Sequence, residues 1–483
     1  MINQMNFYRS YRYEIIAALC GAVVMILELV GARMSAPFFG TSIYVWTAMI
    51  GVILGALSVG YWYGGVMADR KADDDGLMRI IFFAACTVLL TVMVQGWLLP
   101  KVADLPVDLR LQALLGAFLL FAPPALLLGI VSPYVAKLRL SSISTVGQSI
   151  GRLYAAGTLG SIVGTFLAGY WLVAWFGNHT LGLALVAVLV LVSFSATTSG
   201  WVKRRVLLAV AAVVLMLIPS SLPPGVVADV DSAYSRYQVA ERQGGDMTMR
   251  LLTTDRFSIQ SAQIVGMPLV LPLEYTMSFD KALDNSDAKR VLVIGGGTYT
   301  FPSVAAAKDP KRRVTAVEID PTLNDIARKY FAYEDRPNLE IINQDGRTYL
   351  NGLSENSFDI VFLDAFSSLT PPYQLTTFEA AQLVSRALSQ RGVAVANVVG
   401  SPEDDSFTSA MYSTYRKVFR HVAAYPVFPG SDPNMRQNIL FIMTDDAAAA
   451  DCYRTVFDAP LPIASDGMIL TDDFAPVEQL IGS

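Results

Sequence analysis

The sequence predicts an α-helical membrane bundle of about seven spans, followed by an α/β domain that begins with a small β-domain. Two observations lead to this order of domains. From Glu14 to Pro219 the chain is almost entirely apolar, and its charges are confined mostly to short loops. From Asp229 onward the composition is ordinary for a globular protein, and apolar runs of strand length alternate with helical stretches.

The composition limits the classes of function. The chain has 483 residues, enough for two or three domains, of which 53% are hydrophobic and 16% charged. A mean hydropathy of +0.44 is too apolar for an average soluble protein. The net charge of -5 provides no basic surface for nucleic acid. Three cysteines and two histidines are too few for a disulfide framework or a zinc site. From the net charge we therefore expect no nucleic-acid partner, and from the cysteine and histidine counts no metal.

Seven apolar segments are candidates for membrane spans, which need about 20 apolar residues each. They are roughly Ile15–Met34, Tyr44–Met67, Leu77–Leu99, Leu111–Ala136, Ile150–Trp175, Leu181–Phe194 and Val206–Ile218, and the last two are short. The first segment is long, carries Glu28 and lacks a small-residue cleavage site. We therefore interpret it as a signal anchor rather than a cleaved signal peptide.

Basic residues indicate the orientation of the bundle. Arginine and lysine fall on every second loop, near positions 9–12, 70–79, 137–152 and 203–205. Loops with such an excess face the cytoplasm. Seven spans that start inside place the globular half on the non-cytoplasmic side. We expect an integral protein of a bacterial inner membrane, surrounded by the lipid bilayer.

Three local patterns in the helical half suggest close packing or function. Small residues recur every fourth position from Ala156 to Ala168, which lets two helices approach closely. Glu28 lies within an apolar segment, where a carboxylate needs a partner or a wet cavity. We expect Arg33 to neutralise it, and a substrate or proton site is the alternative. Gly60–Arg70 loosely resembles the loop after the second helix of major-facilitator transporters.

The change in composition places a linker at Pro219–Gly225, which is rich in residues that cannot continue a helix. We therefore divide the chain into a multi-pass domain at 1–221, a linker and small β-domain at 222–285, and a Rossmann-like domain at 286–483. The last domain contains the predicted strands Val291–Ile294, Val314–Ile319, Leu339–Asn343, Phe358–Leu363, Val393–Val398 and Asn438–Met443.

Candidate ligand-binding residues follow these strands. Gly295–Gly297 forms a turn after the first strand, where a backbone approaches a ligand closely. Glu318, Asp345 and Asp364 lie at the ends of the next three strands, and ligands bind at this edge of an open α/β sheet. Glu318 stands where an acid accepts hydrogen bonds from ribose hydroxyls. For Asp345, a helix cap is the alternative role.

Together these residues resemble the spermidine synthases, the polyamine aminopropyltransferase family, which are built on the fold of class I methyltransferases. Ser232–Tyr234 and Val239 resemble the small N-terminal β-domain of the family, and Asp364–Pro372 resembles its gating loop. The resemblance covers roughly the last 250 residues, and the whole chain is similar to members fused to membrane helices. It implies S-adenosylmethionine or decarboxylated S-adenosylmethionine as the donor substrate, without a metal.

The resemblance assigns roles to the residues that match. Gly295–Gly297 and Glu318 would hold the ribose end of the donor, and Asp345–Gly346 would lie near the adenine. Asp364 opens the gating loop, where the family uses an acid that helps to deprotonate the attacking amine. These residues are therefore the candidates for donor binding and catalysis.

The residues that would hold a cationic polyamine do not match. The family has Asp-Gly after the glycines, a second gating-loop Asp, a Tyr-His-Glu segment and a β-domain Gln. In their places stand Thr298 with Tyr299, Ser367, Tyr275–Met277 and Ser235. An ammonium group in a partly closed pocket needs carboxylates. The chain keeps groups suited to an adenosyl moiety and loses groups suited to polyamines.

Three functions are compatible with this pattern. The first is alkyl transfer to a non-polyamine acceptor, either a small molecule or a membrane-borne one, with Asp364 as general base. Tyr275, Tyr299 and Tyr373 would then wall the site and face the sulfonium, and ordinary packing is the alternative for them. The second is a non-catalytic adenosyl-binding domain coupled to a transporter-like bundle. The third is methyl transfer, which the same fold supports. A homodimer is one assembly that we consider.

The predicted orientation conflicts with the implied donor. Adenosyl donors are made inside cells, whereas seven spans place the globular half outside the cytoplasm. Either one span is miscounted, or the donor crosses the membrane, or the ligand is different.

Overall fold

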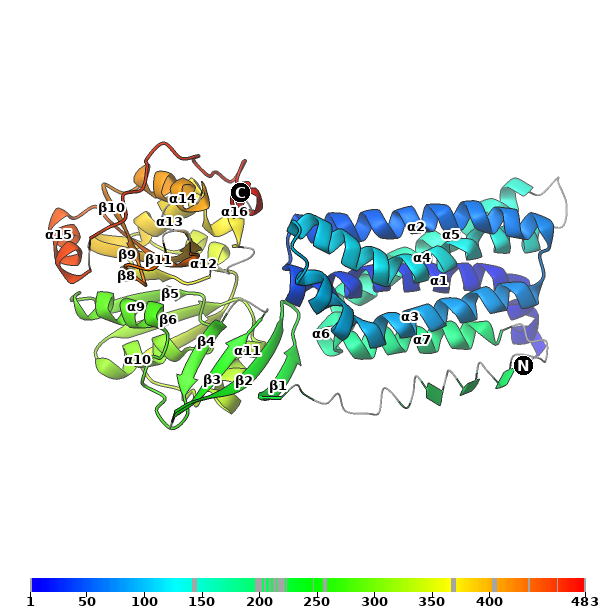
Figure 1. The fold of residues 1–483 in the computed structure, drawn as a ribbon, viewed down its shortest axis with the longest axis horizontal. Coiled ribbons are helices and arrows are strands. Elements are labelled where there is room, and N and C mark those ends of the chain that lie inside the picture. Colours follow the sequence, from blue (N-terminus) through cyan, green and yellow to red (C-terminus); the bar gives the residue numbers. More distant parts are fainter. Residues whose placement is uncertain are drawn as a thin grey trace. The chain divides into compact units, whose positions relative to one another are not determined.

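The computed structural model describes most of the chain (Figure 1). The described residues are 2–140, 146–195, 224–245, 247–254, 259–365, 371–401, 406–432, 435–457 and 459–481, together with scattered residues between 202 and 222. The chain divides into two compact units. One contains Met1–Ser221 and Val230–Arg236, and the other contains Leu222–Asp229 and Tyr237–Ser483.

Five helices of the described chain are long and apolar enough to cross a membrane. They are α1 (Ile2–Phe39), α2 (Ile43–Arg70), α3 (Asp74–Ala103), α4 (Leu109–Arg139) and α5 (Val146–Leu167), which continues through the π-helical turn η2 (Ala168–Leu172). Two shorter helices follow, α6 (Val173–Trp175) and α7 (Asn178–Ser193). The first unit is thus a helical bundle of multi-pass membrane type.

The expectation of about seven spans is corrected to five long helices in the described chain. The predicted span Leu181–Phe194 falls on α7, which has only 16 residues. At 1.5 Å per residue, such a helix is shorter than the hydrocarbon core of about 30 Å. The predicted span Val206–Ile218 lies mostly outside the described residues.

The small residues of α5 pack closely against α1, as their spacing predicts. A Cβ atom at Gly160 would lie 2.0 Å from the carbonyl oxygen of Ala18, and one at Gly164 would lie 2.7 Å from Cα of Ala22. The two helices therefore touch backbone to backbone, which larger residues at these positions would prevent.

The predicted Glu28–Arg33 pair is wrong. Glu28 takes part in none of the ion pairs among the described residues, and Arg33 donates hydrogen bonds to the carbonyls of Ser232 and Ala233. The reason is helical geometry. Five positions along an α-helix turn a side chain by about 140°, so the two residues lie on different faces, whereas pairs form at three or four positions.

A four-stranded antiparallel sheet opens the globular half. It contains β1 (Val226–Asp231), β2 (Arg236–Gly244), β3 (Met247–Thr253) and β4 (Ile259–Ile264), in that order across the sheet. This sheet is the small β-domain that the sequence predicts.

A seven-stranded mixed sheet follows, with the order β10-β11-β9-β8-β5-β6-β7. Its strands are β5 (Arg290–Ile294), β6 (Arg313–Glu318), β7 (Leu339–Asn343), β8 (Phe358–Leu363), β9 (Leu388–Gly400), β10 (His421–Pro426) and β11 (Gln437–Thr444). Strands β5 to β9 pair in parallel, and β10 and β11 are antiparallel. All six predicted strands are present, and β5 lies between β8, the central strand, and β6.

Helices cover both faces of this sheet (Figure 1). One face packs on α9 (Glu274–Asp284), α10 (Thr300–Lys308), α11 (Thr322–Tyr330) and α15 (Ala447–Val456). The other packs on α12 (Gly346–Gly352), α13 (Phe378–Ala387), α14 (Ser406–Arg416) and α16 (Val477–Ile481). Consecutive residues of β5 enter opposite clusters, Val291 the first and Leu292 the second, because strand side chains alternate between faces.

Candidate functional site

The Gly295–Gly297 turn joins β5 to α10 and is closed by contacts with the protein itself. Gly295 has a φ of +93°, and a Cβ atom there would lie 2.4 Å from the carbonyl oxygen of Asp364. Gly297 has a φ of +52°, and its Cβ would lie 2.5 Å from Oγ of Ser261. Both positions require glycine, because a side chain would be strained and would meet neighbouring atoms. The turn holds the ends of β5 and β8 and a residue of β4 together.

Glu318, the last residue of β6, is tied to this turn. Its Oε2 accepts hydrogen bonds from the backbone N–H groups of Gly296 and Gly297 at 2.9 and 3.1 Å, and its Oε1 accepts one from Asp320 at 3.1 Å. Burial raises the pKa of Glu318, and the backbone donors oppose that shift. A ligand hydroxyl at this carboxylate would have to share it with these three donors.

Asp364 directly follows β8, and its backbone N–H donates to the carbonyl of Ile294 on β5 at 2.8 Å. Solvent reaches part of the residue, but protein atoms crowd the carboxylate. Burial raises the pKa of Asp364 to about 7, although the hydrogen bond from Asn397 and the nearby Tyr275 hydroxyl oppose the shift, and the charge of Glu318 adds to it. A carboxylate with a pKa near neutrality can both take up and release a proton at physiological pH.

An amide chain that sequence reasoning missed supports Asp364. Asn397 on β9 is buried and donates from Nδ2 to Oδ1 of Asp364 at 2.9 Å. Its Oδ1 accepts from Nδ2 of Asn438 on β11, also at 2.9 Å. Because Asn438 occupies the oxygen of Asn397, the nitrogen must face Asp364, and this orientation favours the charged carboxylate. The sequence offers one indication of this amide chain: Asn397 and Asn438 are polar residues within strands that are otherwise apolar.

Asp345 is the N-cap of α12. Its Oδ1 accepts a hydrogen bond from Thr348 N at 2.8 Å. This contact is the helix cap predicted from the sequence as the alternative role of Asp345. Gly346 follows it, and a Cβ atom there would lie 2.6 Å from Cγ2 of Ile294. The loop after β7 therefore packs on the end of β5, beside the glycine turn. A role near the adenine stays a prediction.

Thr298 and Tyr299 are both buried. Tyr299 has a left-handed φ of 60°, its ring packs on Gly296, and its hydroxyl donates to Oδ1 of Asn324 at 2.5 Å. The backbone N–H of Thr298 donates to Oγ of Ser261 at 3.0 Å. The Tyr299 ring thus acts as core packing for the glycine turn, and a role as an open wall for substrate stays a prediction.

The other predicted substrate residues lie in different surroundings. The Tyr275 ring packs edge-on against Phe279 at 5.7 Å, and burial and the neighbouring Asp364 raise the pKa of its hydroxyl. Tyr373 is 56% exposed and belongs to the short helix η3 (Tyr373–Leu375). Ser367 lies outside the described residues. The structure therefore gathers Gly295, Glu318, Asp364 and Tyr275 around the end of β5.

Metal chemistry has no ligand set in the described part of the chain. No group of three or more histidine, cysteine, aspartate or glutamate side chains there could hold a metal ion. The three cysteines are free thiols, and two of them, Cys20 and Cys86, lie in the helical bundle.

Comparison with known proteins finds similarity over the globular half. Residues 274–444 match the family model described as "Spermine/spermidine synthase domain", from the start of α9 to the end of β11. The chain is 28% identical over 223 residues to the polyamine aminopropyltransferase of Vibrio vulnificus, covering 42% of this chain and 74% of that protein. It is 30% identical over 196 residues to a probable polyamine aminopropyl transferase of Bifidobacterium longum, covering 39% of this chain and 41% of that protein.

Among solved structures, a probable spermidine synthase from Corynebacterium glutamicum is 21% identical with a TM-score of 0.44, covering 53% of this chain and 99% of that chain. The family match shows that the globular half contains a spermine/spermidine synthase domain. None of these similarities concerns major-facilitator transporters, so that likeness of the helical half stays a prediction.

Proposed function

We propose that the chain, whose residues 274–444 form a spermine/spermidine synthase domain, is a membrane-anchored transferase with an adenosyl donor and a non-polyamine acceptor. The donor would be S-adenosylmethionine or decarboxylated S-adenosylmethionine. The observation that supports catalysis is Asp364. It directly follows the central strand β8, and its pKa lies at about 7. The side-chain amide of Asn397 donates a hydrogen bond to its carboxylate, which stabilises the charged form.

The proposed chemistry is a displacement at carbon. A nucleophile on the acceptor attacks a carbon next to the sulfonium of the donor, and a new bond to that carbon forms as the carbon–sulfur bond breaks. The electron pair stays on sulfur, which leaves as a neutral thioether. The proton of the nucleophile passes to Asp364, because a carboxylate within hydrogen-bond reach serves as general base. Holding both reactants in line would supply much of the remaining acceleration.

The donor site would use the groups around the end of β5. The Gly295–Gly297 turn brings backbone close to the sheet edge where ligands of such sheets bind, and Glu318 lies beside it. Asp345 and Gly346 follow the neighbouring β7 strand. We assign these residues to the ribose and adenine ends of the donor, as the family resemblance implies.

The acceptor site carries little charge for a polyamine. Thr298, with a neutral and buried side chain, replaces the acid that follows the glycines in the family. Thr276 and Met277 replace a further His-Glu pair, and Met277 is 44% exposed. Since an ammonium group without carboxylate partners loses its hydration uncompensated, these replacements favour a neutral acceptor.

The helical unit would hold the enzyme at the bilayer and bring it near membrane-borne acceptors. Five long apolar helices fit a multi-pass membrane protein. By the charge rule, the globular half would face the non-cytoplasmic side, so a donor made inside the cell would have to cross the membrane. An odd number of spans keeps this assignment whether five or seven helices cross.

Asp364→Asn in the full-length, detergent-solubilised protein tests this function. Turnover, measured as release of the thioether nucleoside from the donor, should fall by about 10²- to 10⁴-fold, whereas donor binding measured by calorimetry should persist. Unchanged turnover would exclude Asp364 as the base.

Thermal unfolding controls for misfolding in the same variant. The folded pKa of Asp364, about 7, lies above its ordinary value of 3.8. Its protonated form therefore favours folding at low pH, and this contribution disappears as the pH rises through about 7. Above pH 7, Asp364→Asn should unfold at the same temperature as the parent protein or higher, so lost turnover would not reflect unfolding.

A second candidate function is a non-catalytic adenosyl-binding domain coupled to the helical bundle. The replacement of the amine-binding acids at Thr298 and Thr276 favours it, and the retained Asp364 argues against it. Flux of a substrate across proteoliposomes that changes with adenosyl ligand, in protein without transferase turnover, would support this candidate instead.

A further inference from the structure

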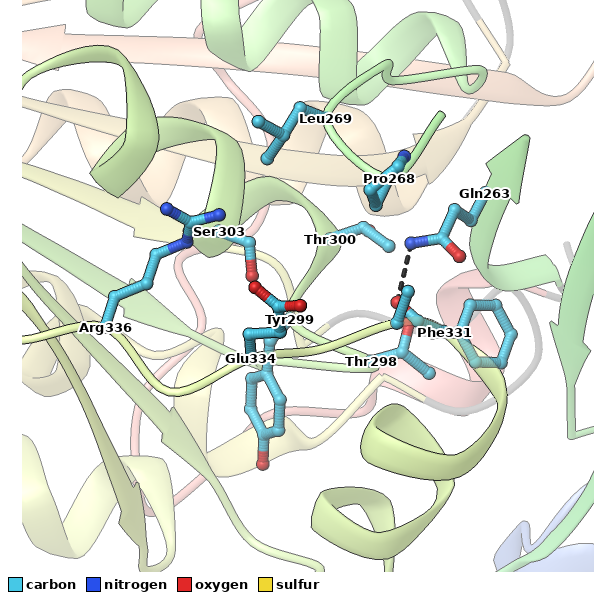
Figure 2. Close-up of a pocket in the computed structure, with 11 residues that line it drawn as sticks. Gln263, Pro268, Leu269, Thr298, Tyr299, Thr300, Ser303, Phe331, Glu334 and Arg336 are labelled. Carbon is cyan, nitrogen blue, oxygen red and sulfur yellow. Dashed lines mark hydrogen bonds between the residues drawn. The ribbon is translucent and has the colours of Figure 1, made fainter. Parts of the chain in front are cut away.

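A cavity lies beside the glycine turn, on the side of the small β-domain (Figure 2). Its volume is about 110 Å³, and its walls come from β4, the loop after β4, the first turn of α10 and the loop after α11. Asp364, Glu318 and Tyr275 are not among the residues that line it. The cavity therefore lies apart from the proposed base, Asp364, but it shares Thr298 with the proposed acceptor site.

The cavity is held open by a fixed contact. Gln263, at the end of β4, is only 4% exposed and donates from Nε2 to the carbonyl of Phe331 at 2.6 Å. This bond, drawn dashed in Figure 2, fastens the loop after α11 to the small sheet. A ligand would therefore enter a site that is largely formed before binding.

A helix start and an arginine bring positive charge to the cavity. Helix α10 begins there at Thr300, and Tyr299 at its N-cap position provides no side-chain cap. The first N–H groups of a helix lack partners within it and carry partial positive charge. Arg336 and Ser303, a residue of the same helix, also line the cavity (Figure 2). Within the described residues, no ion pair involves Arg336.

An unsatisfied polar atom marks the same place independently. Thr298 lines the cavity and is only 1% exposed, and its Oγ1 is buried without a hydrogen-bond partner among the described residues. A buried hydroxyl without a partner costs free energy unless a ligand or water satisfies it. Its presence beside the uncapped helix start indicates a site for a hydrogen-bonding ligand.

The rest of the lining supplies a negative charge and an apolar wall. Glu334 also lines the cavity (Figure 2), and within the described residues its carboxylate forms no ion pair. Pro268, Leu269 and Phe331 line the cavity with apolar surface. Side chains of opposite charge in one cavity, Arg336 and Glu334, together with an apolar wall, match a small zwitterion with an apolar tail.

We propose that this cavity binds an α-amino-carboxylate group. The carboxylate would meet Arg336 and the start of α10, the ammonium would meet Glu334, and the tail would pack on Leu269 and Phe331. Two sources carry this chemistry: a free α-amino acid, and the amino acid end of S-adenosylmethionine. The proposal does not depend on transferase activity, because it rests on the charges and the buried hydroxyl of this cavity.

Calorimetry on the full-length, detergent-solubilised protein tests the zwitterion requirement. The probes are L-norvaline, pentanoate, which lacks the ammonium group, and butylamine, which lacks the carboxylate. We expect norvaline to bind at least about tenfold more tightly than either analogue, because each analogue leaves one charged side chain without a partner. Equal affinity for norvaline and pentanoate, or no binding of any probe, would overturn the proposal.

Matched variants locate the site. Arg336→Gln and Glu334→Gln should each weaken norvaline binding by about tenfold, since each removes one charged hydrogen-bond partner. Arg391→Gln is the control, because the Arg391 side chain is 88% exposed and belongs to β9, outside the cavity. If Arg391→Gln weakens binding as much as Arg336→Gln, norvaline binds elsewhere and the proposal fails.

Competition separates the two sources. If the amino acid end of S-adenosylmethionine occupies the cavity, that donor should displace norvaline, and Arg336→Gln should weaken its binding but spare methylthioadenosine, which has no amino acid end. If a free amino acid is the ligand, norvaline and S-adenosylmethionine should bind together. If the parent protein binds norvaline in this cavity but turns over no donor, the result counts against the proposed function alone.

Discussion

The carboxyl ends of β6 and β8 lie on either side of β5, and each carries one acid in a different environment. Glu318 after β6 accepts three backbone hydrogen bonds, two of them from the glycine turn. Asp364 after β8 is contacted by side chains, the Asn397 amide and the Tyr275 hydroxyl, and its pKa lies at about 7. Backbone donors are fixed by the fold, whereas side-chain donors can exchange partners when a ligand arrives. The difference separates an acid that shapes the loop from one able to handle a proton.

The largest expected effect comes from Gly295→Ala, which disturbs both ends at once. Gly295 has a φ of +93°, and its Cβ would lie 2.4 Å from the Asp364 carbonyl oxygen. We expect a loss of roughly 2–4 kcal/mol of stability, because strain and a backbone clash combine. Thermal unfolding of the full-length protein measures it. Gly352→Ala is the control, since nothing lies within 4 Å of a Cβ there, and an equal loss in both variants would contradict the clash.

Glu318→Gln should affect the β6 end mainly through structure. An amide has one oxygen, so it cannot accept from the glycine turn and from Asp320 together without turning its own N–H groups toward one donor. We expect a loss of about 1–3 kcal/mol in stability, with weaker donor binding. Glu340→Gln on β7, an exposed position, is the control in thermal unfolding and calorimetry. A variant with unchanged stability and donor binding would mean that the Glu318 carboxylate does not hold the glycine turn in place.

Asn397→Leu should affect the β8 end through protonation. The amide donates to the carboxylate and stabilises its charged form, so its removal should raise the pKa of Asp364 further above 7. The rising limb of turnover against pH should move upward by about one unit, which corresponds to one hydrogen bond to a charged group. Tyr275→Phe should shift the limb in the same direction. An unshifted limb in both variants would show that another group sets it.

The sequence predicts the elements of this site better than their contacts. The glycine turn and the acids Glu318 and Asp364 follow from strand periodicity and from the rule that ligands bind at strand ends. Asn397 and Asn438 carry no such signal, because they pair only when β9 and β11 lie side by side across more than forty residues of chain. In the helical half, the long spans are readable from composition, but the hydrogen-bond partners of Arg33, the carbonyls of Ser232 and Ala233, depend on three-dimensional packing.

The smallest expected effect belongs to Asn438→Leu, which touches Asp364 only through Asn397. Without the Asn438 donor, the Asn397 amide can rotate and present its oxygen to the carboxylate part of the time. The pKa of Asp364 should then rise by less than in Asn397→Leu, and the pH limb should move in the same direction by a fraction of a unit. Asn438→Ser retains a donor and should restore the limb. If serine restores nothing although the protein folds, Asn438 acts by packing alone, and the orientation of Asn397 must come from β9 itself.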